Sequence, residues 1–377
     1  MLNRAKIMQE LERVSGSLFF DISDELRIAQ RVWHEISEDP TFIFKAREAK
    51  TDWLMPTWID PLGNRSASYA CKEYTVYSVD GSQIYPDRHQ GTSCSLINVG
   101  RVTLAYGQQS SVHFQSIPYV FTSHDAQAYD NAVDWINCLR QEYEFNHGIE
   151  LVAEHRKDTV HTHDGKNIPE LLIFDGSLIF WHLESKNLQT HADFLATYLG
   201  SLYQLSQQQI FFASYISAPK SKELVNLIRL QLSNFDPINE AYKQVDHLVD
   251  AHIAAFFLQP TERTIVFQNH SPITQSYPES IKPYFFYLHN GYEIGRVEIP
   301  AWIAQDSKKV DQVAAIILDQ CQKGYGYPVA IAEAHEQAVV KGPDREFFYQ
   351  IVQRIGVLQK RSLQPSIKSM KKMRMGI

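Results

Sequence analysis

The sequence has few cysteines and no long apolar run. Only four cysteines occur in 377 residues, and no two of them form a C-x-x-C pair. This pattern argues against a disulfide framework or a zinc ribbon and fits a reducing cytoplasm. No segment approaches the roughly 20 apolar residues that a membrane-spanning helix needs, and the charged helical start does not resemble a signal peptide. We therefore expect a cytoplasmic protein without a membrane partner.

Glycine-rich phosphate-binding loops are also missing. The sequence contains neither G-x-G-x-x-G nor G-x-x-x-x-G-K-[ST], which argues against a nucleotide-powered motor or a dinucleotide-dependent enzyme. Positive charge is not in excess, since 36 basic and 43 acidic residues give a net charge of −7. This balance disfavours general coating of nucleic acid, but it is compatible with a local basic channel or with carboxylates that hold metal ions.

The residues that are present predict a packed α/β fold. Hydrophobic residues make up 44% and charged residues 21% of the chain, which indicates a substantial core. Residues 3–35 read as helical, with an apolar seam at Ile7, Leu11, Val14 and Leu18. Such a seam packs on its own domain or forms a coiled dimer contact.

Strand and helix patterns alternate after a loop-like stretch at 56–68. The predicted strands are 74–82, 93–106, 114–121, 171–180, 264–268, 283–288 and 292–298. The predicted helices are 126–157, 192–207, 222–232, 239–257, 306–322 and 344–359, the last two being separated by 327–332. We divide the chain into an N-terminal helical extension (1–60), a main domain (70–362) and a basic C-terminal tail (363–377).

Two matching segments carry the strongest chemical signal. Val79-Asp80-Gly81-Ser82 and Phe174-Asp175-Gly176-Ser177 each place an aspartate where an apolar strand is expected to give way to a turn. A buried strand holds its terminal carboxylate rigidly, and the glycine lets other groups come close. Two such carboxylates on neighbouring strands would suit Mg²⁺ or Mn²⁺, although Asp-Gly-Ser is also a common turn sequence.

Two further regions supply candidate ligands. The predicted helix before the second motif carries Glu142, Glu150 and Glu154. Glu150 and Glu154 share one helix face, so that either could project into the site. Near the C-terminus, small residues surround His335, whose imidazole could reach a metal ion, a phosphate or a leaving oxygen.

Together these segments resemble the NurA nuclease family over nearly the whole chain. The resemblance is carried by Val79–Ser82, by a helix glutamate, by Phe174–Leu178, and by Tyr327-Pro328 followed by Ala334-His335. It implies an RNase H-like mixed sheet flanked by helices, with N- and C-terminal helical additions. It also implies a Mn²⁺-dependent DNA nuclease, with Mg²⁺ as an alternative metal, that resects DNA ends by 5′–3′ exonuclease and single-strand endonuclease activity.

The resemblance also implies partners and roles. Family members act as homodimers docked on a HerA-type hexameric ATPase. By resemblance, Asp80, Glu150, Asp175 and His335 would hold two metal ions, Tyr327 would orient the site, and Lys220 would meet a substrate phosphate.

Two other functions stay open at this stage. A metal-dependent phosphatase acting on small phosphoesters could also use an aspartate at a strand end, although the sequence lacks the Asp-x-Asp pair of the haloacid-dehalogenase type. An inactive scaffold could dock on a DNA translocase without doing chemistry. A scaffold has no physical need for converging carboxylates, so the sequence favours an active enzyme.

Overall fold

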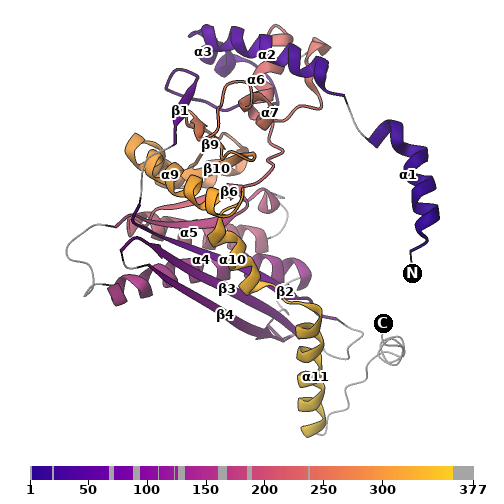
Figure 1. Cartoon of the computed structure of the whole chain (residues 1–377), viewed down its shortest axis with the longest axis vertical. Helices are drawn as coiled ribbons and strands as arrows, with labels where there is room; N and C mark the ends of the chain where they lie inside the picture. Colours follow the sequence, from indigo (N-terminus) through magenta and orange to yellow (C-terminus); the bar gives the residue numbers. More distant parts are fainter. Residues whose placement is uncertain are drawn as a thin grey trace.

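A computed structural model describes residues 2–359, except 19–20, 68–71, 88–93, 109, 123, 126–131, 160–167, 185–188 and 237. One large mixed sheet runs through the protein, with strand order β1-β7-β9-β10-β6-β5-β2-β3-β4, and β8 pairs with β9. Helices cover both faces of this sheet (Figure 1). The α/β class and the RNase H-like arrangement expected from the resemblance are confirmed. The basic tail at 363–377 lies outside the described residues.

The central strands place the segments of interest next to one another. β2 pairs antiparallel with β3, which pairs antiparallel with β4; on its other side β2 lies parallel to β5, and β5 lies parallel to β6. The strands beyond β6 are antiparallel to their neighbours. The bounds are β1 (Asn64–Ser66), β2 (Tyr74–Ile84), β3 (Ser95–Tyr106), β4 (Ser111–Phe121), β5 (Glu170–Asp175), β6 (Phe212–Ile216), β7 (Glu262–Thr264), β8 (Phe267–Gln268), β9 (Pro283–His289) and β10 (Ile294–Pro300).

Two helix pairs enclose the central strands. α4 (Ala132–Thr159) and α5 (Gln189–Gln207) pack against one face, over Tyr77, Val79, Leu172 and Phe174. α9 (Ser307–Lys323) and α10 (Val329–Ala338) pack against the opposite face, over Val76, Leu171 and Ile173. Alternate residues of each strand therefore face different helix layers, as the two-residue period of a strand requires. None of the described helices is long and apolar enough to cross a membrane.

The predicted N-terminal helix is two helices. α1 spans Arg4–Leu18 and α2 spans Ser23–Glu38, so that a single helix over 3–35 was wrong. A new helix start at Ser23 has a local cause, because Asp21 accepts a hydrogen bond from the Ser23 N–H at 2.9 Å and Asp24 and Glu25 follow in the first turn. The seam residues Ile7, Leu11 and Leu18 are exposed, and α1 stands apart from the body (Figure 1).

Most of the remaining helices lie in two places, in an apolar cluster around α2 and after α10 toward the C-terminus. α2 and α3 pack with α6 and α7 in a separate apolar cluster. The bounds are α3 (Phe42–Glu48), α6 (Glu223–Leu232), α7 (Asp250–Ala254), α8 (Ala301–Ala304) and α11 (Gly342–Leu358), with short 3-10 turns η2 (Trp181–Leu183), η3 (Glu240–Val245), η4 (Pro272–Ser276) and η5 (Glu279–Ile281).

Three predicted elements differ from the structure. The strand expected at 171–180 ends at Asp175, because Gly176 turns the chain with a φ of +84°. The helix expected at 239–257 is the 3-10 turn η3 followed by the short α7, and the strand expected at 264–268 is divided between β7 and β8. The segment 327–332 is not a simple spacer, since α10 begins at Val329 directly after Pro328, a residue that favours a helix start.

Gly100 on β3 allows α10 to lie close to the sheet. A Cβ atom at this position would lie 2.3 Å from the Ala334 carbonyl oxygen and 2.5 Å from the Ala338 nitrogen. We expect Gly100→Ala to lower the free energy of unfolding by about 1–3 kcal/mol, because neither backbone atom can move freely. Gly200→Ala is the matched control: no atom lies within 4 Å of its added methyl group, and in the helix α5 it should stabilise by up to about 1 kcal/mol. Denaturant unfolding of both variants measures the contrast, and equal effects would contradict it.

Candidate active site

The two motif aspartates lie on neighbouring parallel strands. β2 and β5 pair from Thr75↔Glu170 to Ser78↔Ile173, and two residues further in the same register come Asp80 and Asp175. Asp175 is the last residue of β5, as expected. Asp80 is not at a strand end, because β2 continues to Ile84 through its pairing with β3. The parallel pairing of β2 with β5 ends at Ser78, before Asp80 is reached. Asp80 and Asp175 therefore lie just beyond the last hydrogen-bonded residues of this strand pair.

α10 brings a histidine to Asp80. The His335 Nδ1 lies 2.8 Å from the Asp80 Oδ2. The end of α10 is fixed on the sheet, because the Ala338 carbonyl accepts hydrogen bonds from the Ser82 Oγ at 2.5 Å and from the Asn98 Nδ2 at 2.7 Å. Ser82 belongs to the first Asp-Gly-Ser motif, so this motif both supplies a carboxylate and holds the helix that carries the imidazole.

The chain just before α10 contributes a tyrosine to Asp175. The Tyr327 hydroxyl donates a hydrogen bond to the Asp175 Oδ1 at 2.9 Å, and the Tyr327 ring packs edge-on against Tyr215 of β6. The structure thus brings together four of the predicted residues in two hydrogen-bonded pairs, Asp80 with His335 and Asp175 with Tyr327.

A third carboxylate comes from α4, and it is Glu144. Its Oε1 would lie 2.9 Å from a Cβ atom at Gly81, and the Cγ of Arg140 would lie 2.7 Å from the same atom. The glycine of the first motif therefore leaves the space that these α4 side chains occupy. Arg140 forms an ion pair with Glu144 and also donates to the Gly81 carbonyl at 3.2 Å. The Glu144 side chain is only 14% exposed.

The pKa values of Glu144 and Asp175 are both raised. The pKa of Glu144 is raised to about 7, chiefly by burial and also by Asp80 and Asp175, while Arg140 opposes them. Burial also raises the pKa of Asp175, as does Asp80, whereas the Tyr327 hydrogen bond lowers it. In a site that is largely buried, neighbouring carboxylates are less stable as anions than they are in water. A cation bound among them would remove this cost.

The glutamate predicted from the sequence lies elsewhere on α4. Glu150 is exposed, and its Oε2 lies 3.3 Å from the Nδ1 of His147. Glu154 forms an ion pair with Arg101, and no described hydrogen bond joins Glu142 to the aspartates. The sequence pattern did not point to Glu144, because its position is set by the packing of α4 on the sheet. Positions 140, 144 and 148 share one face of a helix, and a Cβ at Gly148 would contact Leu172, so Glu144 is a charge on the face that meets the sheet.

Lys220 takes no part in these contacts. It is exposed and follows β6, four residues after Ile216. Because β5 and β6 are parallel, it lies beyond the same end of the sheet as Asp175.

The second motif is held by a buried carboxylate from β10. The Glu298 Oε2 accepts hydrogen bonds from the Ser177 Oγ and from the Leu178 N–H, both at 2.8 Å. The Glu298 Oε1 accepts from the Arg296 Nε at 2.9 Å. Nothing in the sequence pattern singled out Glu298, since it joins the motif only through the pairing of β10 with β6.

The donor set fits a hard divalent cation. His335 is hydrogen-bonded to Asp80, and the carboxylates of Glu144 and Asp175 interact electrostatically with Asp80; no thiol is among these four side chains. Oxygen-rich sites with one nitrogen ligand suit Mg²⁺ and Mn²⁺ better than a zinc site rich in thiolates. The residues present therefore match what a metal-dependent hydrolase requires.

Comparison with known proteins gives one family. The family model described as the NurA domain matches residues 74–340, a range that contains all the residues of the candidate site. No curated protein matches the chain. Among solved structures, the chain is similar to the protease-reverse transcriptase of prototype foamy virus at 16% identity, with a TM-score of 0.21. That alignment covers 49% of this chain and 23% of the other, so the chain spans about a quarter of that protein's length.

Proposed function

Because the chain belongs to the NurA family of nucleases, we propose that it is a Mn²⁺-dependent deoxyribonuclease that acts in DNA end resection and double-strand-break repair. The proposed activities are 5′–3′ exonuclease and single-strand endonuclease cleavage. The observation that carries this proposal is the placement of Asp80 and Asp175 on neighbouring parallel strands, with His335 bonded to Asp80 and Glu144 interacting electrostatically with both aspartates.

We assign each side chain a role. Asp80, Glu144, Asp175 and His335 would hold the metal, with two ions as the expected number and Mg²⁺ as a possible substitute. The bound metal would supply Lewis acidity toward a phosphodiester and lower the pKa of an attacking water. Glu144 replaces Glu150 in this assignment, because only Glu144 interacts electrostatically with both aspartates.

The remaining residues would orient groups and balance charge. Tyr327 fixes the orientation of Asp175 through its hydroxyl. His335 bonds to Asp80 through Nδ1, which leaves Nε2 either to bind the metal or, as the alternative role, to deliver a proton to the leaving oxygen. Arg140 offsets part of the negative charge of the site. Lys220, exposed beyond the same end of the sheet, would contact a substrate phosphate.

We further propose a homodimer docked on a HerA-type hexameric ATPase. Two observations support a partner. The sequence has no phosphate-binding loop of its own, so a motor would reside in another chain. The apolar seam of α1, with Ile7, Leu11 and Leu18 exposed, is available for a coiled contact, because it does not pack on the body of the described chain. The division into a helical extension (1–60), a nuclease domain (70–362) and a tail (363–377) stays part of this proposal.

The test is digestion of end-labelled single- and double-stranded DNA in Mn²⁺, Mg²⁺ or chelator. We expect cleavage with Mn²⁺ that chelator abolishes and that Asp80→Asn lowers by about 10²–10⁴-fold, since the carboxylate is lost without a change of shape. Asp52→Asn, at an exposed aspartate outside the site, is the matched control and should cleave like the wild type.

Other outcomes separate the alternatives. Equal cleavage by the wild type and Asp80→Asn would contradict the site. Absence of cleavage, even after a HerA-type ATPase is added, would leave an inactive scaffold. Hydrolysis of a small phosphoester without cleavage of DNA would identify a phosphatase instead.

A further inference from the structure

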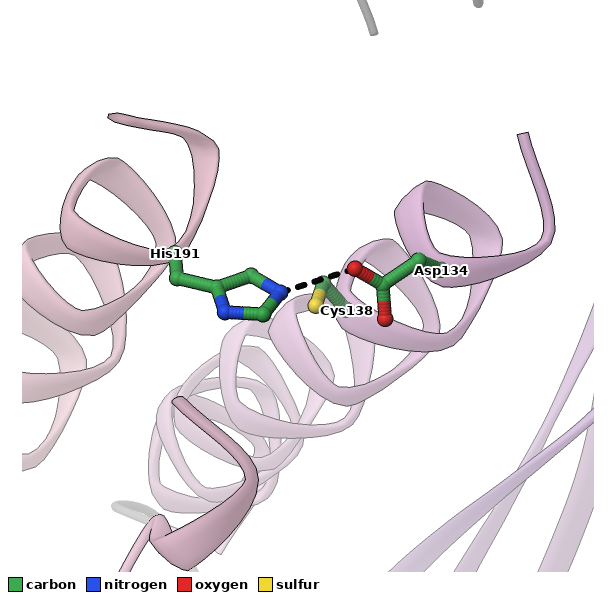
Figure 2. Close-up of side chains that lie close together, drawn as sticks. All are labelled: Asp134, Cys138 and His191. Carbon is green, nitrogen blue, oxygen red and sulfur yellow. Dashed lines mark hydrogen bonds and ion pairs between the residues drawn. The ribbon is translucent and has the colours of Figure 1, made fainter. Parts of the chain in front are cut away.

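A second group of potential metal ligands lies between α4 and α5, away from the face that carries Glu144. Asp134 and Cys138 are one helical turn apart on α4, and His191 is near the start of α5. The His191 Nε2 lies 2.8 Å from the Asp134 Oδ2. One ligand atom of each of the three side chains lies within 4.8 Å of those of the other two. Figure 2 shows the imidazole pointing across to α4, with the sulfur of Cys138 beside the line that joins it to Asp134.

These side chains are enclosed by protein. Cys138 is 1% exposed and His191 is 7% exposed, while the Asp134 side chain is 37% exposed. The Tyr198 hydroxyl donates to the Cys138 carbonyl at 2.5 Å, which fixes the α4 backbone at this point. The partly exposed Asp134 gives an ion access to the two buried ligands.

The three ligand types together match zinc. A thiolate sulfur, an imidazole nitrogen and a carboxylate oxygen are the donors that Zn²⁺ takes in proteins, and three of them leave a fourth tetrahedral position for water. Without a cation the thiol is held protonated, because burial and the nearby Asp134 carboxylate raise the pKa of Cys138 to about 11. A positive ion bound to the sulfur would favour the thiolate and so lower the pKa of Cys138.

The cluster is distinct from the proposed active site. Arg140 and Glu144 lie on the α4 face that meets β2 at Gly81, whereas Asp134 and Cys138 lie on the face that meets α5. The donor sets also differ, because the active-site group contains no sulfur.

We propose that Asp134, Cys138 and His191 form a zinc site that fastens the first turns of α4 to the start of α5. Coordination replaces the Cys138 S–H bond with a bond from sulfur to the metal, and the proton goes to solvent. The ion would hold in place the helix that carries Glu144 into the active site. The site is a structural one in this proposal, and it does not depend on the chain being a nuclease.

Cobalt substitution tests the proposal with a readout other than activity. We would titrate Co²⁺ into the chelator-treated full-length protein and record its absorption spectrum. Thiolate bound to Co²⁺ gives charge-transfer absorption in the near ultraviolet, and tetrahedral Co²⁺ gives intense visible bands. We expect both, and we expect one equivalent of Zn²⁺ to remove them.

Variants identify the ligands. Cys138→Ser should lose the charge-transfer absorption, whereas Cys94→Ser should keep it. Asp80→Asn should also keep it, which separates this site from the proposed active site. His191→Gln should lower the affinity for Co²⁺ at least tenfold, and circular dichroism verifies that each variant is folded. If the wild type lacks thiolate absorption, or if the absorption survives in Cys138→Ser, the cluster is only an ion pair between Asp134 and His191 beside a buried thiol, and the proposal is wrong.

Discussion

Glu144→Gln is expected to abolish DNA cleavage and, at the same time, to stabilise the metal-free protein above neutral pH. Both effects come from the position of Glu144, which is buried and lies near Asp80 and Asp175. In the proposed function this carboxylate helps to bind a cation, whereas without the cation its charge destabilises the fold. The amide keeps the shape of the side chain and removes the charge. We expect cleavage to fall by about 10²–10⁴-fold, the range for loss of a group that acts directly in the chemistry.

The stability effect depends on pH in a defined direction. The pKa of Glu144 rises from its usual value of 4.5 in the unfolded chain to about 7 in the folded protein. Below about pH 4.5 the side chain is neutral in both states and contributes no penalty. As the pH rises through this window, the unfolded state loses its proton first, so the wild type is progressively destabilised. Above pH 7 the full penalty is present, on the order of 3 kcal/mol.

Thermal or urea unfolding in chelator at pH 5 and at pH 8 measures this effect. Glu144→Gln should be more stable than the wild type at pH 8, with a much smaller difference at pH 5. Glu150→Gln, at the exposed position on the same helix, is the control, and we expect neither its cleavage nor its stability to change appreciably. Should Glu150→Gln lose cleavage while Glu144→Gln keeps it, the sequence-based choice of glutamate was right and the assignment made from the structure is wrong.

The contrast between these two glutamates shows how much of the candidate site can be predicted from the sequence. Asp80, Asp175, Tyr327 and His335 could be proposed from the sequence because each belongs to a short segment with its own recognisable pattern. The structure joins them in two hydrogen-bonded pairs. Glu144 belongs to no such segment. Its place is fixed by the rotation of α4 on the sheet, which depends on close contacts at Gly81 and Gly148 that a local pattern does not reveal.

Other differences have the same origin in tertiary packing. Asp80 was expected at a strand end, because Asp-Gly-Ser is a turn sequence, but pairing with β3 carries β2 on to Ile84. By contrast, Asp175 is the last residue of the short β5 and pairs with Tyr215 of β6, and the chain turns at Gly176 as predicted. The same three residues thus form a strand interior in one place and a strand end in the other.

Glu298 is the clearest case of a residue that only the fold reveals, and replacing it should have a large effect on stability. It is 1% exposed, and its carboxylate accepts from three donors, the Ser177 Oγ, the Leu178 N–H and the Arg296 Nε. Arg296 is also buried and pairs with Glu223 at 2.9 Å. In Glu298→Gln the amide has one acceptor oxygen and two donor hydrogens, so at least one of the three donors loses its partner.

We expect Glu298→Gln to lower the free energy of unfolding by about 3–5 kcal/mol, the usual cost of breaking a buried ion pair on one side. Where the protein remains folded, cleavage should also fall, because Ser177 and Leu178 lie directly after the turn that sets the position of Asp175. A displacement of about 1 Å in such a group can lower the rate about 10²-fold.

The matched control is Glu279→Gln, which breaks the ion pair with Lys282 at a glutamate side chain that is 87% exposed. That change should cost no more than about 1 kcal/mol, because water screens an exposed pair. Urea unfolding of both variants, together with Arg296→Met and the double variant, completes the comparison. If the network acts as one unit, the double variant costs less than the sum of the two single changes. Additive effects, or equal costs for Glu298→Gln and Glu279→Gln, would mean that the buried carboxylate does not hold the second motif in place.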